Sequence, residues 1–261
     1  MHGGSAVPTA LARLVRLVLA PNPGPMTLEG TCTWVLHGPA GAVVVDPGPQ
    51  DAGHRAAVLD AVAHPPAGLP SALVQVLLTH SHHDHAAGAA ELAAEAGAPL
   101  LPAGSLLDGR DPGGLGLQAL ATPGHTDDSV TLLLPAAAGG PAALLTGDTV
   151  LGRGSTAVAP DGLGAHLASL RALLALAAEA GSGAPVVLLP GHGPVRADAA
   201  EVVQELLAHR LERLEQVRAA VAAGARTPAD VVAAVYPGLG PGLATAAERT
   251  AAASLALLRG A

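Results

Sequence analysis

Short apolar runs that each end in a polar loop are the feature that most constrains the fold of this 261-residue chain. The third run leads directly into His80, and the last leads directly into Pro190-Gly191-His192. Runs of this length, bounded by turn-forming residues, predict β-strands, and their nearly continuous apolar character is typical of strands covered on both faces. We therefore expect a layered α/β fold with functional loops at the strand ends. The runs are Thr31–Leu36, Ala42–Asp46, Leu73–Thr79, Leu117–Ala121, Val130–Leu134, Ala142–Thr146 and Val186–Leu189.

Ala- and Leu-rich stretches between these runs predict helices. Further on, Thr227 as the N-cap residue and Pro228 at the first helical position predict another helix, and Pro241–Leu258 predicts a last one. We therefore divide the chain into a domain over residues 1–196 and a helical C-terminal region over residues 197–261. The earlier predicted helices are Gly53–Ala63, Ala87–Ala96, Leu163–Ala180 and Ala199–Ala222.

The composition limits the class of protein. Half of the residues are hydrophobic and only 13% are charged, which excludes a disordered chain and allows a sizeable core. The formal net charge is −8, all 13 basic residues are Arg, and Trp34 and Tyr236 are the only residues of the Phe, Tyr and Trp types. Such a chain lacks the basic face and the stacking rings that bind nucleic acids, so we expect a small-molecule substrate rather than RNA.

The single cysteine, Cys32, excludes an intramolecular disulfide and favours a reducing compartment. The most apolar N-terminal stretch, Leu11–Ala20, contains Arg13 and Arg16, which is not typical of a signal peptide. No apolar run approaches the roughly 18 residues that span a bilayer. We therefore expect a cytoplasmic protein without a membrane partner, and the sequence makes no prediction about its oligomeric state.

The segment Thr79-His80-Ser81-His82-His83-Asp84-His85 carries four histidines in six residues. In an extended segment side chains alternate, so His80, His82 and Asp84 point to the same side. If a helix begins near Asp84, the turn brings His85 to the same place. Imidazole nitrogens and carboxylate oxygens in this pattern predict a site for a divalent metal such as Zn, Fe or Mn.

Three glycine-containing loops after predicted strands add further candidate ligands. Glycine permits the tight backbone conformations by which a short loop can aim one side chain inward. Because each loop follows a predicted strand, we expect all three to meet the histidine cluster. They hold His125 in Pro123-Gly124-His125-Thr126, Asp148 in Gly147-Asp148-Thr149 and His192 in Pro190-Gly191-His192-Gly193-Pro194.

The His-x-His-x-Asp-His cluster, followed in order by Gly-His-Thr, Gly-Asp-Thr and Pro-Gly-His-Gly-Pro, resembles the metallo-β-lactamase superfamily. Within it, the chain is similar to the glyoxalase II-like branch and to the lactamase-β-like group that includes a mitochondrial endoribonuclease. The resemblance covers most of the chain. It implies a four-layer αββα sandwich as the catalytic domain and a small winged-helix-like C-terminal region.

The resemblance also implies the ligands of a dinuclear site. It puts His80, His82 and His125 on a first metal and Asp84, His85 and His192 on a second, with Asp148 bridging the two. The expected cofactors are two divalent metal ions, with Zn²⁺ preferred over Fe or Mn.

Other positions receive supporting roles. Asp46 matches an acidic residue that supports the ligand loop in this family. We assign it this role because metal ligands need partners that orient them. His83 occupies a variable position and is expected at the surface or behind a ligand. Cys32 stands where the family more often has Asn, and we expect it to be buried as a small hydrophobic residue. Arg153 and Ser155, shortly after Asp148, are candidate substrate-binding residues.

These roles predict a metal-dependent hydrolase. Hydroxide held by the two metals attacks a carbonyl or phosphoryl centre, while Asp84 orients the nucleophile and accepts its proton. The first interpretation is hydrolysis of an acyl thioester or ester. The alternatives are a metal-dependent endoribonuclease acting on single-stranded RNA, β-lactam hydrolysis, and a non-catalytic metal-binding module.

Overall fold

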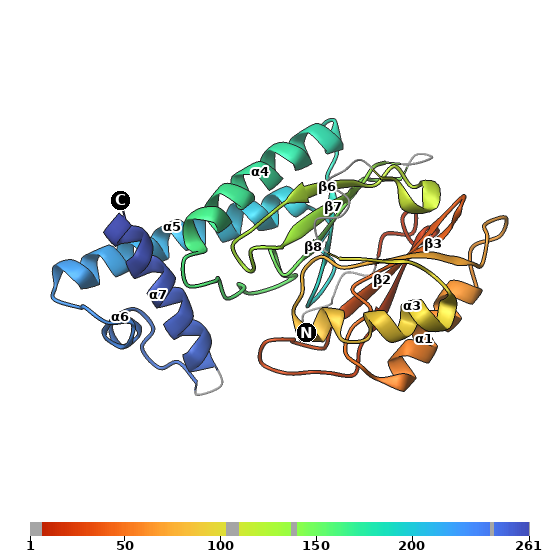
Figure 1. The fold of residues 1–261 in the computed structure, drawn as a ribbon. Helices are drawn as coiled ribbons and strands as arrows, with labels where there is room; N and C mark the ends of the chain where they lie inside the picture. The colour runs from red at the N-terminus through yellow and green to blue at the C-terminus, as the bar shows by residue number, and fades with distance from the viewer. Residues whose placement is uncertain (1–6, 103–109, 137–139, 241–242, 261) are drawn as a thin grey trace.

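The computed structural model describes residues 7–102, 110–136, 140–240 and 243–260. Two β-sheets lie face to face, and helices cover the outer face of each sheet, so the layers run helix, sheet, sheet, helix (Figure 1). This arrangement confirms the predicted αββα sandwich. All the predicted strands are present, and each end lies within two residues of its predicted position.

The first sheet is mixed and has the strand order β1-β2-β3-β4-β5. Its first three strands pair antiparallel, whereas β4 pairs parallel with both β3 and β5. Helices α1 (Ala52–Ala63) and α3 (Ala89–Ala96) cover its outer face, where Val58 and Leu92 pack against Val44 and Val76. The strands are β1 (Val15–Leu19), β2 (Cys32–Gly38), β3 (Gly41–Val45), β4 (Leu73–Leu77) and β5 (Leu100–Leu101).

The second sheet has the order β6-β7-β8-β9, with antiparallel pairs except for the parallel pair of β8 and β9. Helix α4 (Leu163–Gly181) and the first half of α5 (Ala199–Ala222) cover its outer face, where Leu170, Leu173 and Val203 pack against Leu144 and Leu188. The strands are β6 (Gln118–Ala121), β7 (Val130–Leu134), β8 (Ala143–Gly147) and β9 (Val187–Pro190).

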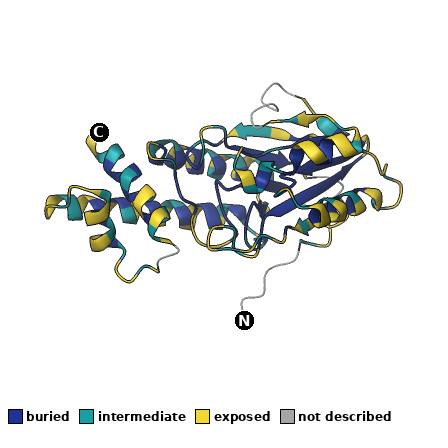
Figure 2. Cartoon of the chain, turned by 60° about the horizontal axis from the view of Figure 1, so that its bottom comes forward, coloured by how far each residue is buried: buried dark blue, intermediate teal, exposed yellow. Residues whose placement is uncertain are grey.

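The central core lies between the two sheets. Along β2, Trp34 and Leu36 point into this core while Val35 packs under the outer helices, as the period of two in a strand requires. Leu145 and Leu189 of the second sheet meet them from the other side. Because both faces of the central strands are covered, their apolar runs are nearly continuous, and Figure 2 shows these strands as the buried centre of the molecule.

The C-terminal helices form their own cluster at one end of the sandwich (Figure 1). Thr227 caps α6 (Pro228–Val235) in a capping box with Asp230, as the Thr-Pro start predicts. Val217 of α5 packs there against α6 and α7 (Ala244–Gly260). Since α5 contacts both the second sheet and these helices, it joins the two parts of the chain, and the division at residue 196 stays a prediction.

Within the described part of the chain, one helix, α4, is long and apolar enough to cross a membrane by length and composition, with a mean hydropathy of 1.3. Arg171 and Glu179 lie within this helix, so its uninterrupted apolar runs stay shorter than the roughly 18 residues of a membrane span. The apolar side chains Leu170, Leu173 and Ala177 are buried against the second sheet and α5, so packing in the sandwich accounts for its hydrophobicity.

Some short elements escape the sequence analysis. Strand β1 lies at the edge of the first sheet, where Val15 is buried but Leu17 and Leu19 are exposed. Strand β5 has two residues, and the 3₁₀ helix η2 (Pro112–Gly114) has three. Helix α2 (His83–Ala86) is a single turn, which begins one residue before the helix start expected near Asp84.

Candidate metal centre

Four loops at one edge of the sandwich bring the predicted ligands together. Parallel pairing of β3 with β4 and of β8 with β9 places the C-terminal ends of these strands at that edge. The segment after β4 carries residues 80–85, and the loops after β6, β8 and β9 carry His125, Asp148 and His192. All seven predicted ligands therefore lie within one cluster.

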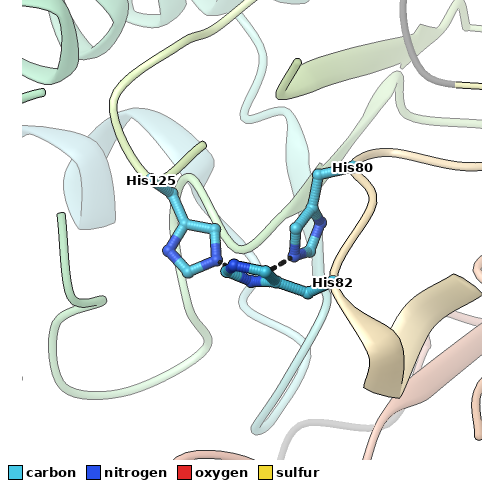
Figure 3. A group of neighbouring side chains, drawn as sticks. All are labelled: His80, His82 and His125. Carbon is cyan, nitrogen blue, oxygen red and sulfur yellow. Dashed lines mark hydrogen bonds between the residues drawn. The ribbon is translucent and has the colours of Figure 1, made fainter. Parts of the chain in front are cut away.

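His80, His82 and His125 form the first group, and their ligand atoms all lie within 4.8 Å of one another. Figure 3 shows the three imidazole rings converging from two loops. Nδ1 of His82 lies 3.2 Å from Nε2 of His80 and 2.8 Å from Nε2 of His125. The extended backbone at His82, with φ −61° and ψ 145°, keeps its side chain on the same side as that of His80.

Asp84, His85 and His192 form the second group. Nε2 of His192 lies 3.1 Å from Oδ2 of Asp84 and 3.2 Å from Nε2 of His85. The single turn of α2 brings the side chain of His85 back toward the loops, so the turn expected from the sequence is present.

Asp148 lies between the two groups. Its Oδ1 is 3.3 Å from Nε2 of His85, and its Oδ2 is 3.5 Å from Nε2 of His192 and 3.6 Å from Nε2 of His125. One carboxylate thus faces ligands of both groups, which is the geometry that a bridging ligand requires.

The far ring nitrogen of each of three ligands donates to a fixed acceptor. Nδ1 of His85 donates to Oδ2 of Asp46 at 2.9 Å, Nδ1 of His125 to the carbonyl of Ala157 at 2.8 Å, and Nδ1 of His192 to the carbonyl of Gly30 at 3.1 Å. A proton on Nδ1 leaves the lone pair on Nε2, which faces the centre of the cluster. These contacts therefore select the tautomer that binds metal.

Asp46 supports the cluster from behind. Its Oδ1 accepts a hydrogen bond from the backbone N–H of Thr79 at 2.7 Å, and its Oδ2 accepts one from the Thr79 hydroxyl at 2.6 Å. The same hydroxyl lies 3.1 Å from Nδ1 of His80. Asp46 thus contacts one ligand directly and reaches a second through Thr79, a residue that the sequence analysis did not single out.

Gly191 allows the loops to approach closely. A Cβ atom at this position would collide with Oδ1 of Asp148 and would lie 2.8 Å from Cε1 of His85. Only glycine fits between these two side chains without moving them.

Burial controls the protonation of the first group. Burial, together with the nearby charge of His85, lowers the pKa of His80 to about 3. Burial also lowers the pKa of His125 below its usual value. Both imidazoles are therefore neutral at neutral pH, which is the form that binds a metal.

The second group combines imidazoles and carboxylates that hold each other in their charged forms. Burial lowers the pKa of His85, but the carboxylates of Asp148 and Asp46 outweigh burial and raise it well above its usual value. Burial also opposes charge on His192, yet hydrogen bonds to Asp148 and Asp84 raise its pKa to about 9. Burial acts to raise the pKa of Asp84, but the hydrogen bond from His192 outweighs this effect and lowers the pKa to about 2. A cation that bound to this group would take the place of these protons.

The donor set fits divalent cations. The facing imidazole nitrogens lie 2.8 to 3.2 Å apart, close enough for a single cation to contact more than one of them. Oδ1 of Asp148 is buried, and among the described residues it has no hydrogen-bond partner. Imidazole and carboxylate ligands without a thiolate suit Zn, Fe and Mn.

A cavity of about 380 Å³ opens beside the cluster. The predicted metal ligands His82, Asp84, His125 and Asp148 face it, and so do both predicted substrate-binding residues, Arg153 and Ser155. Arg210 of α5, Tyr236 and Arg249 of α7 also line it. The sequence analysis missed these last three, because no motif marks the faces of α5 and α7 or the end of α6.

The remaining candidates lie outside the cluster. His83 is exposed on α2, which agrees with the first of its two expected positions, at the surface. Cys32 is buried in the central core, which confirms the prediction of a small hydrophobic role. Of the isolated histidines, His37, His54 and His166 are buried, and His64 and His209 are exposed.

Comparison with known sequences identifies relatives of this chain. The family model described as the metallo-beta-lactamase superfamily matches residues 26–107. A beta-lactamase-like protein 2 homolog from Caenorhabditis elegans is 30% identical over 79% of this chain and 70% of that protein. An atrochrysone carboxyl ACP thioesterase from Aspergillus fumigatus is 32% identical over 86% of this chain and 73% of that protein.

Solved structures share the fold. A beta-lactamase domain protein from Burkholderia ambifaria superposes with a TM-score of 0.75 and 24% identity, covering 97% of this chain and 89% of that chain. A protein solved in a di-iron-bound form superposes with a TM-score of 0.51 and 26% identity, covering 71% of this chain and 96% of that chain. With the fold, the matched family model and these relatives in agreement, the chain belongs to the metallo-beta-lactamase superfamily of hydrolytic enzymes.

Proposed function

We propose that the chain hydrolyses acyl thioesters or esters at a pair of divalent metal ions. The observation that carries this proposal is the position of Asp148 between two groups of ligands that open into one cavity. Relatives named as thioesterases support an acyl substrate.

His80, His82 and His125 would hold one metal, Asp84, His85 and His192 the other, and Asp148 would contact both. When bound, a metal pair lowers the pKa of water and polarises a substrate carbonyl. The protein's own residues supply the rest of the chemistry, and Asp84 acts as the general base. This carboxylate faces the cavity and is ionised at neutral pH, because the hydrogen bond from His192 lowers its pKa to about 2 even though burial opposes this shift. It can orient the attacking water and accept its proton.

The walls of the cavity suit an acyl group. Met26, Leu28 and Leu151 contribute apolar surface next to the metal ligands. Arg153 and Ser155 are exposed at the same wall, and Arg153 forms an ion pair with Glu29 at 2.6 Å. We assign both residues to substrate binding as part of this proposal.

Zinc is the metal that we propose first, since imidazole and carboxylate ligands suit it and since it needs no redox partner. The di-iron-bound relative makes iron the second choice, with Mn after it. We also propose a cytoplasmic location, in keeping with the single buried cysteine.

The test is a substrate panel on purified, zinc-loaded protein. It contains an acetyl thioester of N-acetylcysteamine, p-nitrophenyl acetate, a short single-stranded RNA and nitrocefin. We expect turnover of the thioester or ester that chelator abolishes and zinc restores. Cleavage of RNA or nitrocefin alone would contradict the proposal, and two bound metals without any turnover would favour the non-catalytic module.

A pair of adjacent histidines supplies a matched control. His82→Ala removes a ligand of the first group, so metal content and turnover should both fall. His83→Ala removes an exposed imidazole from the next position and should leave both unchanged. Equal effects of the two changes would contradict the assigned site.

A further inference from the structure

Arg210 is a buried cation on α5 with incomplete hydrogen bonding. Its side chain lies beside the cavity, yet the residue is only 5% exposed. Nη2 donates to the backbone carbonyl of Thr156, whereas Nε is buried and has no hydrogen-bond partner among the described residues. A guanidinium carries five N–H donors, so this one keeps unused donors in a nearly water-free place.

Among the residues that the structure describes, no carboxylate balances the charge of Arg210. In the described ranges Arg210 takes part in no ion pair, in contrast to Arg55, Arg153 and Arg218. Burial lowers the pKa of Arg210 to about 10, which leaves it charged at neutral pH. Buried charges in proteins are normally paired, because an unpaired one loses its hydration without compensation. An unpaired buried guanidinium beside a cavity therefore points to an anionic ligand.

The position of Arg210 links it to the metal centre. It faces the same cavity as Asp84, His125 and Asp148. Thr156, whose carbonyl it contacts, also places its hydroxyl 2.8 Å from Nδ1 of His125. A molecule with one end at the metal ligands can thus reach Arg210 with its other end.

We propose that Arg210 binds a carboxylate on the substrate, so that the preferred substrates are acyl thioesters or esters with an anionic acyl group. This inference rests on the proposed function of the same site. Arg249, exposed on the cavity wall contributed by α7, adds a second positive charge to the lining of the cavity. Tyr236 lies beside Arg210 in the same wall.

A single carboxylate fits these observations better than a nucleic acid does. One buried guanidinium can neutralise one anionic group, whereas the chain as a whole carries a net charge of −8 that repels a polyanion. The apolar residues Met26, Leu28 and Leu151 of the cavity would face the hydrocarbon part of an acyl chain.

Arg210 could act on substrate in a second way, by holding Thr156 and through it His125. The two roles predict different results. A positioning role affects charged and neutral ligands equally, whereas carboxylate recognition affects only the charged one. The test must therefore compare a ligand with its uncharged counterpart.

The probes are two thioethers of N-acetylcysteamine that cannot be hydrolysed, one ending in a carboxylate and the other in the methyl ester of that carboxylate. Calorimetry measures their binding to the metal-free and to the zinc-loaded protein. We expect wild-type protein to bind the carboxylate at least about tenfold more tightly in both forms, as a hydrogen-bonded charge pair allows. In Arg210→Gln the two probes should bind equally, and in Arg210→Lys part of the preference should remain.

Arg218→Gln is the matched control, because it removes one positive charge from an exposed position of the same helix. It should leave the preference unchanged. If Arg210→Gln does not fold, ¹⁵Nε–¹H spectra of the wild type give a second measurement. The carboxylate probe should shift an arginine Nε–H resonance that is missing from the spectrum of Arg210→Lys, and the ester should not.

The possible outcomes distinguish carboxylate recognition by Arg210 from the proposed hydrolysis of thioesters or esters. Equal binding of both probes by the wild type, or a preference that survives in Arg210→Gln, overturns carboxylate recognition even if thioesters are hydrolysed. A preference that depends on Arg210 in a protein without thioesterase activity supports the recognition site and contradicts the proposed function. Arg210-dependent binding of a short RNA without a preference between the probes overturns the acyl assignment.

Discussion

Nδ1 of His85 lies 2.9 Å from Oδ2 of Asp46, and both side chains are almost completely buried. This contact joins the end of β3 to the turn of α2, two segments that are 39 residues apart in the sequence. It fixes the ring of a metal-site histidine from the side opposite the metal position. Asp46 itself has a φ of 52°, in the left-handed region that Asn and Asp tolerate better than most residues.

Replacement of Asp46 by Asn should weaken metal binding about 10- to 100-fold, which is the usual effect of losing a partner that orients a ligand. The amide keeps the size of the side chain and tolerates the backbone conformation, but one of its two polar atoms no longer accepts a hydrogen bond. Chelator competition at constant pH measures the change. An affinity equal to that of the wild type would show that Asp46 does not orient His85.

The clustering of the candidate metal ligands was largely predictable, because the signals for it are local. The spacing of His80, His82 and Asp84 depends only on the alternation of an extended segment, and His85 joins them through one turn of helix. The loops of His125, Asp148 and His192 each follow a strand that its apolar run identifies. The layers of the fold were predictable for the same reason, since strands covered on both faces leave nearly continuous apolar runs.

The wall of the cavity was not predictable, because it depends on tertiary contacts. Arg210 lies in a helix whose sequence alternates acidic and basic residues, a pattern typical of a solvated face. Its burial arises because the Thr156 segment and α7 pack over this part of α5. Strand β1 was missed for a related reason, since Arg16 on its outer face interrupts an otherwise apolar run.

Replacement of Gly191 by Ala should damage the metal centre. The new methyl group would collide with Oδ1 of Asp148, and forcing extra volume into a packed site costs about 1 to 3 kcal/mol. We expect a lower unfolding midpoint and loss of metal from the second group, measured by denaturant unfolding and metal analysis. Gly240→Ala is the control, since its methyl group would meet no atom within 4 Å in the described structure. Equal behaviour of the two variants would contradict the close approach at Gly191.

Cys32 should react with thiol reagents only when the chain opens. Burial, reinforced by the negative charge of Asp148, raises the pKa of its thiol to about 12, so the reactive thiolate is scarce at pH 8. Because the chain has a single thiol, the rate of its modification by Ellman's reagent reports directly on the accessibility of Cys32. We expect modification at least about 100-fold slower in the native protein than in guanidinium chloride, where the same thiol is exposed. Complete modification of native protein within the mixing time would contradict this burial.

The stability of the metal-free protein should fall as the pH drops below 6.5, in part because of His166. This residue of α4 is completely buried, and neither ring nitrogen has a hydrogen-bond partner in the described part of the chain. Burial, followed by the charge of Arg210, lowers its pKa from 6.5 to about 3. Between these values the unfolded chain takes up a proton that the folded chain does not, so stability is complete above pH 6.5 and is lost toward pH 3.

The contribution of His166 can be isolated by replacing it with Leu, which cannot titrate. Between pH 7 and pH 5.5, linkage predicts a loss of about 1 kcal/mol in the unfolding free energy from one such histidine. Urea unfolding in the presence of chelator measures this loss without a contribution from metal release. Because other buried histidines also titrate, the wild type should lose more stability than His166→Leu over this interval, by about that amount. Parallel pH profiles for the two proteins would show that His166 takes up its proton equally in the folded and unfolded chains.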